Sequence, residues 1–413
     1  MVTAVDKIRL AKAAANSLAQ SNTLVKNQVL RNIATLLPAR AEQIIAANAI
    51  DLANGVASGL STGLQDRLKL DDKRIQALAD AVSLVIDLPD PVGDVVRGRT
   101  LPNGLQINQV RVPFGVIGAI YEARPNVTID IAALAIKSGN ATVLRGGTAA
   151  ENTNAVLVTL LQDALEQAGV DRDAVQTVDE FGRQGANDMM QAVGLIDVLV
   201  PRGGAGLIKS VVNESKVPVI QTGDGVVHIF IDESARVDWA VEIVLNSKTQ
   251  RPSVCNALET LLVHQNAVDT VLPAVVAALK AKNVVLHGDQ TMVNQFGAVP
   301  ATEDDWNAEY YTLDLAVKVV ADIDEALQHI AKYSTHHTES ILTENVANAE
   351  KFLAQVDSAV VMVNASTRFT DGEQMGFGAE IGISNQKLHA RGPMGLEQMT
   401  TTTWIVWGTG QIR

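Results

Sequence analysis

One side chain in the sequence is of a type that readily forms covalent intermediates, and it is Cys255, the only cysteine among the 413 residues. Residues 248–256 around it read Lys-Thr-Gln-Arg-Pro-Ser-Val-Cys-Asn, so its neighbours are polar or cationic. Nearby positive charge favours a thiolate, and a thiolate attacks activated carbonyl groups. The alternative is an inert buried thiol, which is the commoner role of a solitary cysteine. The setting of Cys255 favours a nucleophile.

The segments on either side of Cys255 predict that it lies in a loop. Apolar residues spaced three and four apart at 237–245 indicate a helix, which has to end before Pro252. Residues 261–263 indicate the strand that follows. Loops at the ends of sheets commonly display reactive groups, so this position suits a catalytic residue.

Two glycine turns could bind phosphate. Each follows an apolar run and precedes a helix-like segment, so its backbone amides would lie at a helix N-terminus. The residues concerned are Arg145, Gly146 and Gly147 in the first turn and Gly203, Gly204 and Gly206 in the second. Neither has the full G-x-G-x-x-G spacing, and the alternative is that each glycine pair only allows the chain to reverse.

The pattern around these turns alternates between strand and helix. Apolar runs occur at residues 116–120, 142–144, 174–178, 196–200 and 217–220, with helical stretches at 128–137 and 154–167 between them. Such alternation predicts an α/β fold with a doubly wound parallel sheet. We expect a cofactor-binding domain at residues 1–94 and 113–224, with a helical first ninety residues, and a second α/β catalytic domain at 225–390.

A third, smaller element is predicted to be all β. Residues 95–112 indicate a hairpin whose tight turn is Asn103-Gly104, and residues 400–407 indicate a further β-prone segment. We expect residues 95–112 and 391–413 to form a small oligomerisation element. Its exposed strand edges predict a homo-oligomer.

Composition limits the partners. The chain has 33 Lys+Arg against 46 Asp+Glu, so its formal charge is −13, and 47% of it is hydrophobic. Without a basic block, a nucleic-acid or anionic-membrane partner is disfavoured, and a small-molecule substrate becomes the default. No run is apolar enough to cross a membrane, no export signal is visible, and one cysteine cannot form an internal disulfide, so we expect a cytoplasmic protein. No cysteine or histidine spacing indicates a metal site.

Four runs carry a resemblance to a known family. They read Gln-Arg-Pro-Ser-x-Cys-Asn at 250–256, Tyr-Glu-Ala-Arg-Pro-Asn at 121–126, Val-x5-Ala-Leu-x-His-Ile-x2-Tyr-Ser-Thr-x-His-Thr-Glu-x-Ile at 320–341, and Gly-Ala-Glu-Ile-Gly through Lys-Leu-His-Ala-Arg-Gly-Pro at 378–393. Together they resemble the gamma-glutamyl phosphate reductases, or glutamate-5-semialdehyde dehydrogenases, of the aldehyde dehydrogenase superfamily. The resemblance spans nearly the whole chain and implies an aldehyde-dehydrogenase-like fold.

The resemblance implies NADPH-dependent reduction of L-glutamyl 5-phosphate to L-glutamate 5-semialdehyde in proline biosynthesis. Cys255 would form a thioester and release phosphate, and the cofactor would reduce it. Two departures from hydrolytic relatives stand out. Gln221 replaces their water-activating Glu, which favours a reductase, and Ala123 replaces their oxyanion-hole Asn. The oxyanion donor is left open between the Cys255 amide with a polar neighbour and Asn126.

The resemblance also implies ligands for NADPH and for an amino-acid substrate. Arg145 would bind the 2′-phosphate, the second glycine turn would bind the pyrophosphate, and Glu309 would bind the nicotinamide ribose. The candidate substrate-binding residues are Glu122, Arg124, Asn126, His329, His337, Glu339 and Arg391. For Arg145 the alternative is a surface ion pair, and for the histidines it is polar packing.

Other readings remain open at this point. The chain could be a different phosphorylating or hydrolytic aldehyde dehydrogenase, or an inactive scaffold or sensor with the same fold. Because an acyl phosphate is unstable, glutamate 5-kinase, which would supply it, is a possible partner.

Overall fold

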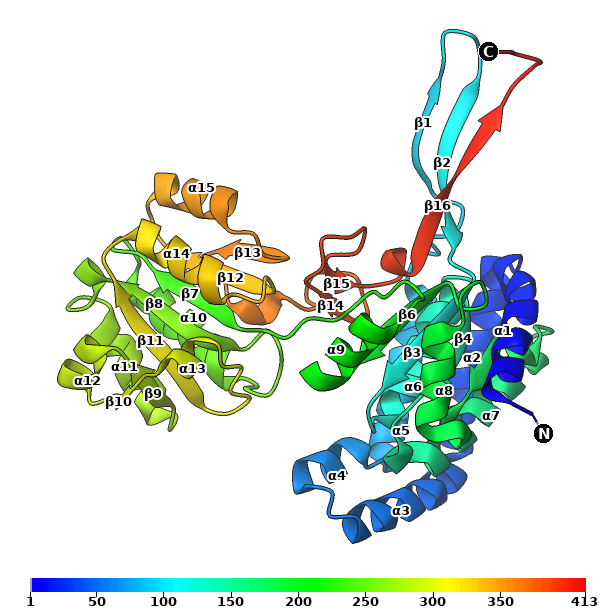
Figure 1. The fold of residues 1–413 in the computed structure, drawn as a ribbon, viewed down its shortest axis with the longest axis horizontal. Coiled ribbons are helices and arrows are strands. Elements are labelled where there is room, and N and C mark those ends of the chain that lie inside the picture. The colour runs from blue at the N-terminus through cyan, green and yellow to red at the C-terminus, as the bar shows by residue number, and fades with distance from the viewer. Residues whose placement is uncertain (1) are drawn as a thin grey trace. The chain divides into compact units, whose positions relative to one another are not determined.

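The computed structural model describes residues 2–413, which form two compact units (Figure 1). Unit 1 comprises the chain up to Thr222, Gly376–Gly382 and Met394–Arg413. Unit 2 comprises Gly223–Met375 and Ile383–Pro393. Each unit contains its own parallel sheet.

The sheet of unit 1 has four parallel strands in the order β5-β4-β3-β6. The strands are β3 (Val116–Tyr121), β4 (Ala141–Arg145), β5 (Val175–Thr177) and β6 (Val198–Arg202). Every residue of β3 is buried, as expected of a central parallel strand that is covered on both faces. Because β4 and β5 extend the sheet on one side of β3 and β6 on the other, the strand order reverses between β3 and β6. Ligands of open α/β sheets bind at the carboxyl ends of the strands beside such a reversal.

Helices cover this sheet. Those between strands are α6 (Pro125–Lys137), α7 (Glu151–Gln167) and α8 (Gly182–Gln191), and α9 (Ala205–Glu214) follows β6. The expected helical N-terminal part contains α1 (Ala4–Ala19), α2 (Thr23–Ala39), α3 (Ala41–Ala57), α4 (Thr62–Leu68) and α5 (Asp72–Asp87). Short 3-10 helices are η1 (Thr148–Ala150), η2 (Arg172–Ala174) and η3 (Asp179–Phe181). The helices bury apolar stripes; in α5, for example, Ile75, Leu78 and Val82 are buried.

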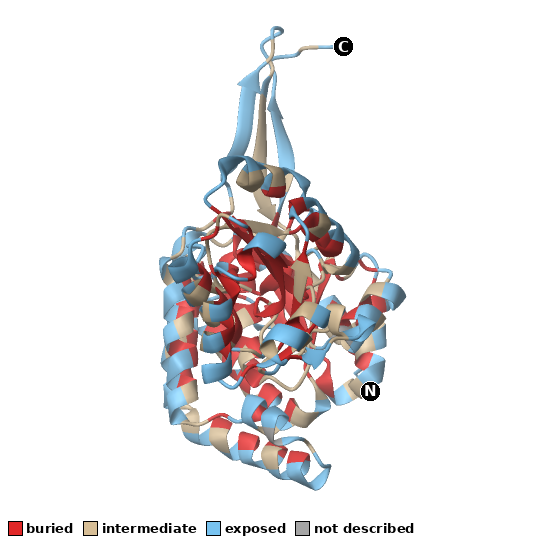
Figure 2. Cartoon of the chain, turned by 90° about the vertical axis from the view of Figure 1, so that its left-hand side faces the viewer, coloured by how far each residue is buried: buried red, intermediate tan, exposed pale blue. Residues whose placement is uncertain are grey.

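The predicted β extension is present. Strand β1 (Val95–Thr100) pairs with β2 (Gln106–Pro113), and β2 pairs with β16 (Thr400–Trp407), both antiparallel. Gly104 has φ 86°, which the turn between β1 and β2 requires and glycine adopts without strain. Figure 2 shows these three strands mostly in exposed and intermediate colours, whereas buried residues gather in the parallel sheets and on the helix faces that cover them.

The sheet of unit 2 has seven parallel strands in the order β10-β9-β11-β8-β7-β12-β13. Its strands are β7 (Val227–Ile231), β8 (Leu258–His264), β9 (Val285–Gly288), β10 (Val299–Pro300), β11 (Asp314–Val320), β12 (Thr338–Leu342) and β13 (Val360–Val363). Alternate side chains enter two different buried clusters: Ile229 and Ile231 belong to one, and Phe230 belongs to the other. The period of two places these clusters on opposite faces of the sheet.

Helices connect these strands. They are α10 (Val237–Thr249), α11 (Leu272–Ala281), α12 (Gln290–Phe296), α13 (Glu303–Trp306), α14 (Ile323–Tyr333) and α15 (Val346–Gln355), with η4 (Gln265–Ala267) and η5 (Thr367–Phe369). The C-terminal part adds β14 (Gly382–Ser384), β15 (Gly392–Met394) and η6 (Glu397–Met399).

Two expectations about chain organisation are corrected. Residues 217–220 form no strand; only Val219 makes a single bridge, to Leu199, because the preceding Pro218 has no amide to continue a ladder. Gly376–Gly382 belongs to unit 1 rather than to the second domain. Gly378 approaches Leu88 so closely that a Cβ would lie 2.2 Å from that side chain, and Ile381 donates its amide to Met394.

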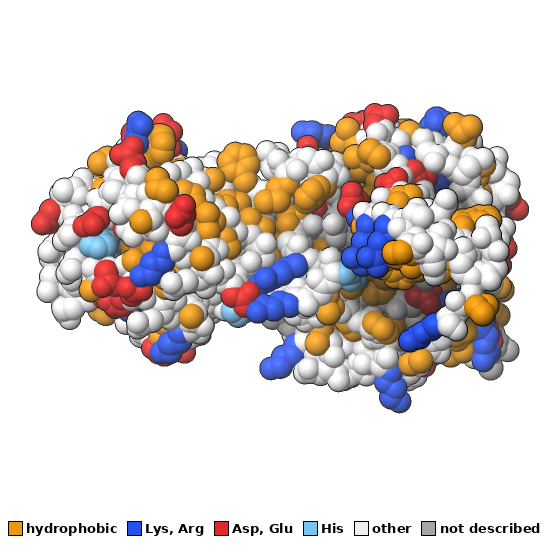
Figure 3. Space-filling view, turned by 90° about the horizontal axis from the view of Figure 1, so that it is seen from above, with side chains coloured by type: hydrophobic (Ala, Val, Ile, Leu, Met, Phe, Trp, Pro, Cys, Tyr) orange, Lys and Arg blue, Asp and Glu red, His pale blue; other side chains and the backbone are white. Residues whose placement is uncertain are grey.

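Two surface properties bear on partners. Within residues 2–413, no helix is long and apolar enough to cross a membrane. On the face drawn in Figure 3, Lys and Arg side chains lie in separate small groups among uncharged and acidic ones.

Candidate active site

Cys255 lies half-buried in the loop between α10 and β8, as the sequence predicts. The next residue fixes that loop. Asn256 is buried, its Nδ2 donates to the Thr370 carbonyl at 2.8 Å, and its own carbonyl accepts from Thr367 Oγ1 at 2.7 Å. The loop is therefore anchored directly after the thiol.

The other side of the Cys255 backbone is in contact with Gly225. A Cβ on Gly225 would lie 1.5 Å from the Cys255 carbonyl oxygen and 2.5 Å from its carbonyl carbon. No side chain fits there, so a glycine is needed because of this close approach. The segment before β7 thus packs on the peptide group of the proposed nucleophile.

A buried ion pair joins the two ends of the Cys255 loop. Lys248 Nζ, near the end of α10, lies 2.6 Å from Glu259 Oε2 on β8, and neither side chain is exposed. Burial raises the pKa of Glu259 to about 7 and lowers the pKa of Lys248, while their mutual attraction opposes both shifts. Lys248 is therefore not one of the cations that could favour a thiolate at Cys255, contrary to the prediction from the sequence, because Glu259 compensates its charge.

A second acidic group lies close to the loop. Burial raises the pKa of Glu309, and hydrogen bonds from the Tyr311 hydroxyl and the Gly225 amide partly offset that effect. The Tyr311 hydroxyl lies 2.6 Å from Glu309 Oε2. Asp224 interacts electrostatically with Glu309, and Cys255 with Tyr311. Of these three residues only Glu309 is predicted from the sequence. Asp224 and Tyr311 are not, although the Asp224-Gly225 pair directly before a buried strand is a visible signal.

These groups share one edge of the sheet. Gly225 precedes β7, Cys255 precedes β8, and Glu309 and Tyr311 precede β11. Parallel strands bring their amino ends to the same edge, which is how residues 225, 255 and 309 become neighbours. Unit 2 therefore presents its reactive groups at the amino edge, whereas ligands of open α/β sheets usually bind at the carboxyl edge.

Unit 1 brings three turns together at the carboxyl edge of its sheet, where the strand order reverses. Glu122, after β3, accepts the Gly204 amide on Oε1 at 2.7 Å. A Cβ on Gly203 would lie 2.8 Å from the Glu122 side chain, and one on Gly147 would lie 2.7 Å from the Ala123 amide. Packing therefore requires glycine at 147, where a side chain would meet backbone atoms, whereas a side chain at 203 would have to displace those of Glu122 and Leu207. The acidic group at the start of α9 is favourable because helix N-termini attract negative charge.

The first glycine turn, residues 145–147, is also fixed by a buried carboxylate, that of Asp179. The Gly146 amide donates to Asp179 Oδ1 at 2.6 Å, and Asn154 Nδ2 donates to Asp179 Oδ2 at 2.8 Å. Burial raises the pKa of Asp179 to about 6. Arg145 Nε donates to the Gly182 carbonyl at 3.2 Å and leaves its terminal guanidinium nitrogens for another ligand or solvent. Gly206 has nothing within 4 Å of a built Cβ.

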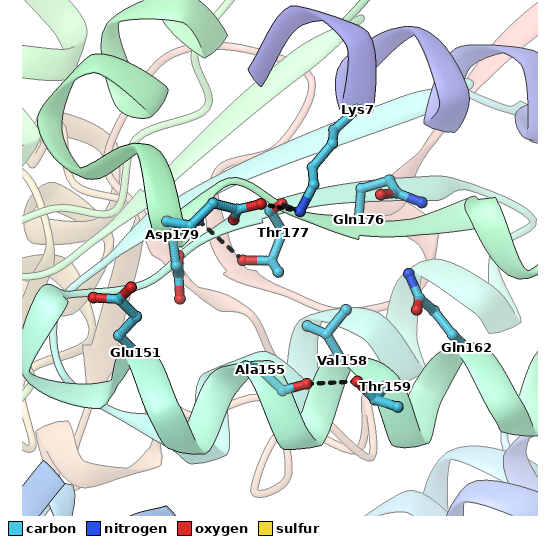
Figure 4. A pocket seen from close by; sticks show the side chains of 10 residues that line it. Lys7, Glu151, Ala155, Val158, Thr159, Gln162, Gln176, Thr177 and Asp179 are labelled. Carbon is cyan, nitrogen blue, oxygen red and sulfur yellow. Dashed lines mark hydrogen bonds and ion pairs between the residues drawn. The ribbon is translucent and has the colours of Figure 1, made fainter. Parts of the chain in front are cut away.

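A cavity of about 270 Å³ lies beside this turn, between α7 and β5 (Figure 4). Several of its polar side chains are paired with neighbours: Lys7 forms an ion pair with Glu180 and donates to the Thr177 carbonyl at 3.1 Å, and Gln162 donates to the Val175 carbonyl. The cavity shares Asp179 with the Gly146 turn.

The candidate substrate residues lie in both units. In unit 1, Arg124 directly precedes α6, and Asn126, in its first turn, donates to Asp130 at 3.1 Å. In unit 2, Arg391 forms an ion pair with Asp357 at 2.9 Å.

The other three candidate substrate residues, His329, His337 and Glu339, are buried in unit 2. Glu339 Oε2 accepts the His228 backbone amide at 2.8 Å. His329 packs against the rings of Trp306 and Tyr333. Their role as substrate ligands is untested and stays a prediction.

One atom of the site fits a nicotinamide cofactor. Glu309 Oε1 is buried and has no hydrogen-bond partner among residues 2–413. Such an acceptor is costly unless a donor reaches it, and a ribose hydroxyl is a suitable donor. In the same part of the chain, no group of three or more His, Cys, Asp or Glu residues is arranged to hold a metal ion.

Comparisons with known proteins agree on a family. The model of the aldehyde dehydrogenase family matches residues 3–307. Gamma-glutamyl phosphate reductases of Leifsonia xyli and Clavibacter michiganensis are each 60% identical, over 99% and 98% of this chain and 97% and 94% of theirs. The crystal structure of gamma-glutamyl phosphate reductase from Thermotoga maritima is 45% identical, with a TM-score of 0.98 over all of both chains. An acetylating aldehyde dehydrogenase from Geobacillus thermoglucosidasius, 19% identical with a TM-score of 0.69, shares the fold.

Proposed function

Since the chain belongs to the aldehyde dehydrogenase family, and within it to the gamma-glutamyl phosphate reductases, we propose that Cys255 is its nucleophile and NADPH its reductant. The chain reduces L-glutamyl 5-phosphate to L-glutamate 5-semialdehyde and releases phosphate, through a cysteine thioester, as a step of proline biosynthesis. The observation that carries the assignment of Cys255 is its place in an anchored loop, half-buried beside Gly225 and close enough to Tyr311 to interact with it electrostatically.

The proposed chemistry begins with the Cys255 thiolate. Its sulfur attacks the C5 carbonyl of the acyl phosphate, and the bond to the phosphate oxygen breaks with its electron pair, leaving a thioester. NADPH, when bound, would supply the hydride that reduces this thioester to a tetrahedral alkoxide. The carbon–sulfur bond of that alkoxide then breaks, which releases the aldehyde and restores the Cys255 thiolate. Asn256 and Gly225 hold the loop still during these steps, because they fix the peptide groups at and after Cys255.

Each unit, taken by itself, has groups that suit a part of NADPH. In unit 1, the glycine turns at 145–147 and 203–206 would bind the phosphates, with Arg145 at the 2′-phosphate, since a guanidinium binds phosphate bidentately. Glu122 holds the Gly204 amide in this structure, so a pyrophosphate there would have to displace its carboxylate. In unit 2, Glu309 would accept a ribose hydroxyl on its buried Oε1.

The remaining proposals concern the substrate, partners and compartment. Within unit 1, Arg124 is the candidate for the substrate α-carboxylate and Glu122 for its ammonium group, once the Glu122 carboxylate leaves the Gly204 amide. Within unit 2, Arg391 is a separate candidate for a carboxylate. Copies of the chain would associate through the β extension. Glutamate 5-kinase would deliver the acyl phosphate directly, since water hydrolyses it. A reducing, cytoplasmic compartment would keep the thiol reactive.

The test is the reverse reaction, in which glutamate 5-semialdehyde, phosphate and NADP react to give NADPH. The absorbance of NADPH measures its rate. We expect phosphate-dependent NADPH formation by the wild type and a loss of at least about 10³-fold in Cys255→Ser, which lacks a competent nucleophile. Cys255→Ser that retains wild-type activity would overturn the assignment. Formation of NADPH without phosphate would instead indicate a hydrolytic aldehyde dehydrogenase.

A further inference from the structure

The segment that packs on Cys255 is held in place by residues outside the catalytic loop. Gly223, Asp224 and Gly225 precede β7 and have few side-chain atoms of their own with which to fix their position. The Gly225 backbone nevertheless contacts both the Cys255 peptide and the Glu309 carboxylate. Some other part of unit 2 therefore has to hold this segment in register.

Thr335 provides the first hold. Its Oγ1 accepts the backbone amide of Val226 at 3.0 Å, directly after Gly225. Asn385 Nδ2 donates to the Thr335 carbonyl at 2.7 Å. The same Asn385 side chain lies against Gly223, where a Cβ would be 2.4 Å from its amide group, and the Gly223 amide donates to the Ile383 carbonyl at 3.0 Å. Residues 223–226 are thus fixed at both ends, at Gly223 by residues 383 and 385 and at Val226 by Thr335.

Glu339 provides the second hold. Its fully buried carboxylate accepts the His228 amide at 2.8 Å and the His228 ring Nδ1 at 3.0 Å on Oε2. Its Oε1 accepts the hydroxyl of Ser334, the residue before Thr335. The Ser334 hydroxyl in turn accepts the His336 amide at 2.8 Å. Glu339 therefore connects strand β7, through His228, to the turn that carries Thr335, through Ser334. These two contacts flank the hydrogen bond between Thr335 and Val226.

We propose that Thr335 and Glu339 are positioning residues for Cys255, which act by holding residues 223–226 against the Cys255 peptide and Glu309. This rests on the proposed function, because it concerns the same nucleophile. Neither side chain needs to touch the substrate. The effect of losing the Thr335 hydroxyl is to release Val226 and, with it, the Gly225 contact.

The chain offers matched variants. Thr335→Val keeps the shape of the side chain and removes the acceptor of the Val226 amide, whereas Thr335→Ser keeps the hydroxyl. Thr343→Val is the control: Thr343 is buried, its Oγ1 accepts the Asn345 amide at 2.9 Å, and it follows β12 at the opposite end from Thr335. Both valine variants remove a hydroxyl that accepts a backbone amide, but only one of them is connected to Cys255.

Two readouts separate positioning from general destabilisation. The first is kcat and KM in the reverse reaction with glutamate 5-semialdehyde. The second is the rate of alkylation by iodoacetamide as a function of pH, which reports on the thiol without interference because Cys255 is the only cysteine. Small misplacements of reacting groups cost up to about 100-fold in rate.

We expect Thr335→Val to lower kcat roughly tenfold or more, with KM within about twofold, and to shift the pH profile of alkylation. Thr335→Ser should restore both to within about twofold, and Thr343→Val should keep wild-type kcat and alkylation even where it lowers the unfolding midpoint. Equal losses in Thr335→Val and Thr343→Val, or wild-type values in Thr335→Val, would overturn the proposal.

Two further controls complete the design. If Thr335→Val does not fold, Asn385→Asp replaces it, because the isosteric carboxylate cannot donate to the Thr335 carbonyl; it should lower kcat and shift alkylation in the same way, and wild-type values would overturn the proposal. Cys255→Ser is measured in parallel. If Cys255→Ser is inactive and Thr335→Val is unchanged, the positioning role fails alone, whereas an active Cys255→Ser removes the proposed function itself.

Discussion

At the scale of single residues, burial decides what a histidine can do. His329 is 4% exposed, and its ring lies 5.4 Å from the Trp306 ring and 4.5 Å from the Tyr333 ring, measured between centroids. Burial, followed by the nearby charges of His228, Lys318 and Lys332, lowers its pKa from 6.5 to about 3. The ring therefore stays neutral at any pH at which the enzyme works, as polar packing requires.

This shift predicts a dependence of stability on pH. Between about pH 6.5 and pH 3 the unfolded chain binds a proton at His329 that the folded chain does not bind, so the free energy of unfolding falls as pH falls. His329→Phe should show a smaller fall, measured by urea unfolding between pH 7.5 and pH 4.5. Parallel curves for the two proteins would contradict the prediction. A large rise in KM for glutamate 5-semialdehyde in His329→Phe would instead support a substrate ligand.

Arg145 permits a test of cofactor choice. Its Nε is bound to the Gly182 carbonyl, and the rest of the guanidinium is available to a 2′-phosphate. We expect Arg145→Leu to raise KM for NADPH by about 10- to 100-fold, the value of one charge-assisted contact, with KM for NADH little changed. Arg172→Leu, which removes an exposed arginine paired with Glu166, is the control. An equal effect on both cofactors would count against the 2′-phosphate role.

At the scale of elements, the catalytic loop depends on what closes its ends. Helix α10 and strand β8 are joined by the Lys248–Glu259 pair, which lies in the interior with no exposed side-chain surface. Glu259 Oε1 has no partner among the described residues, so this carboxylate depends on Lys248 and the Tyr310 backbone. Taking two charges from water costs several kcal/mol per ion, and only the mutual attraction offsets it.

Replacing one residue of the Lys248–Glu259 pair should therefore lower the free energy of unfolding more than replacing both. We expect Lys248→Met to lower the free energy of unfolding by about 3–5 kcal/mol, since it leaves a buried unpaired carboxylate, and Lys248→Met with Glu259→Leu to recover most of that loss. As a control, Arg236→Met at the exposed Arg236–Asp238 pair should leave the free energy of unfolding close to that of the wild type. Urea unfolding of the four proteins measures these values, and a double variant no more stable than Lys248→Met would contradict them.

At the scale of the whole molecule, the β extension exposes apolar surface that monomeric proteins normally bury. Trp404, Val406 and Trp407 on β16 are 52%, 53% and 68% exposed, and β1 exposes Val95 and Val96. Arg97 covers the Trp404 ring at 5.0 Å but leaves the end of β16 open. A second copy of the chain is the partner that we propose for this surface.

Self-association should therefore depend on the end of β16. We expect Trp407→Ser with Val406→Ser to give a smaller species than the wild type in sedimentation velocity, because aromatic anchors dominate interface energies. Leu24→Ser on α2, where Leu24 is 75% exposed, is the control and should leave the assembly unchanged. A wild type that sediments as a monomer at all concentrations would refute the proposed interface.

The local pattern determined much of the molecule from the sequence alone. The hairpin turn at Asn103-Gly104, the helix that ends before Pro252 and the strand–helix alternation all follow from neighbouring residues, because they reflect backbone preferences and side-chain periodicity. The motif around Cys255 likewise identified the family. The strand predicted at residues 217–220 is wrong, since the local pattern of an apolar run with a proline does not reveal that the run contacts β6 at a single bridge.

Only the tertiary structure decided which distant residues meet. Gly225, Cys255, Glu309 and Thr335 lie at least 26 residues from one another in the sequence. Parallel pairing of β7, β8, β11 and β12 nevertheless brings the segments before these strands to one edge. The pairing of Lys248 with Glu259, and therefore the loss of Lys248 as a cation for the thiol, has the same origin. Strand order and burial are properties of the whole sheet, so no window of sequence contains them.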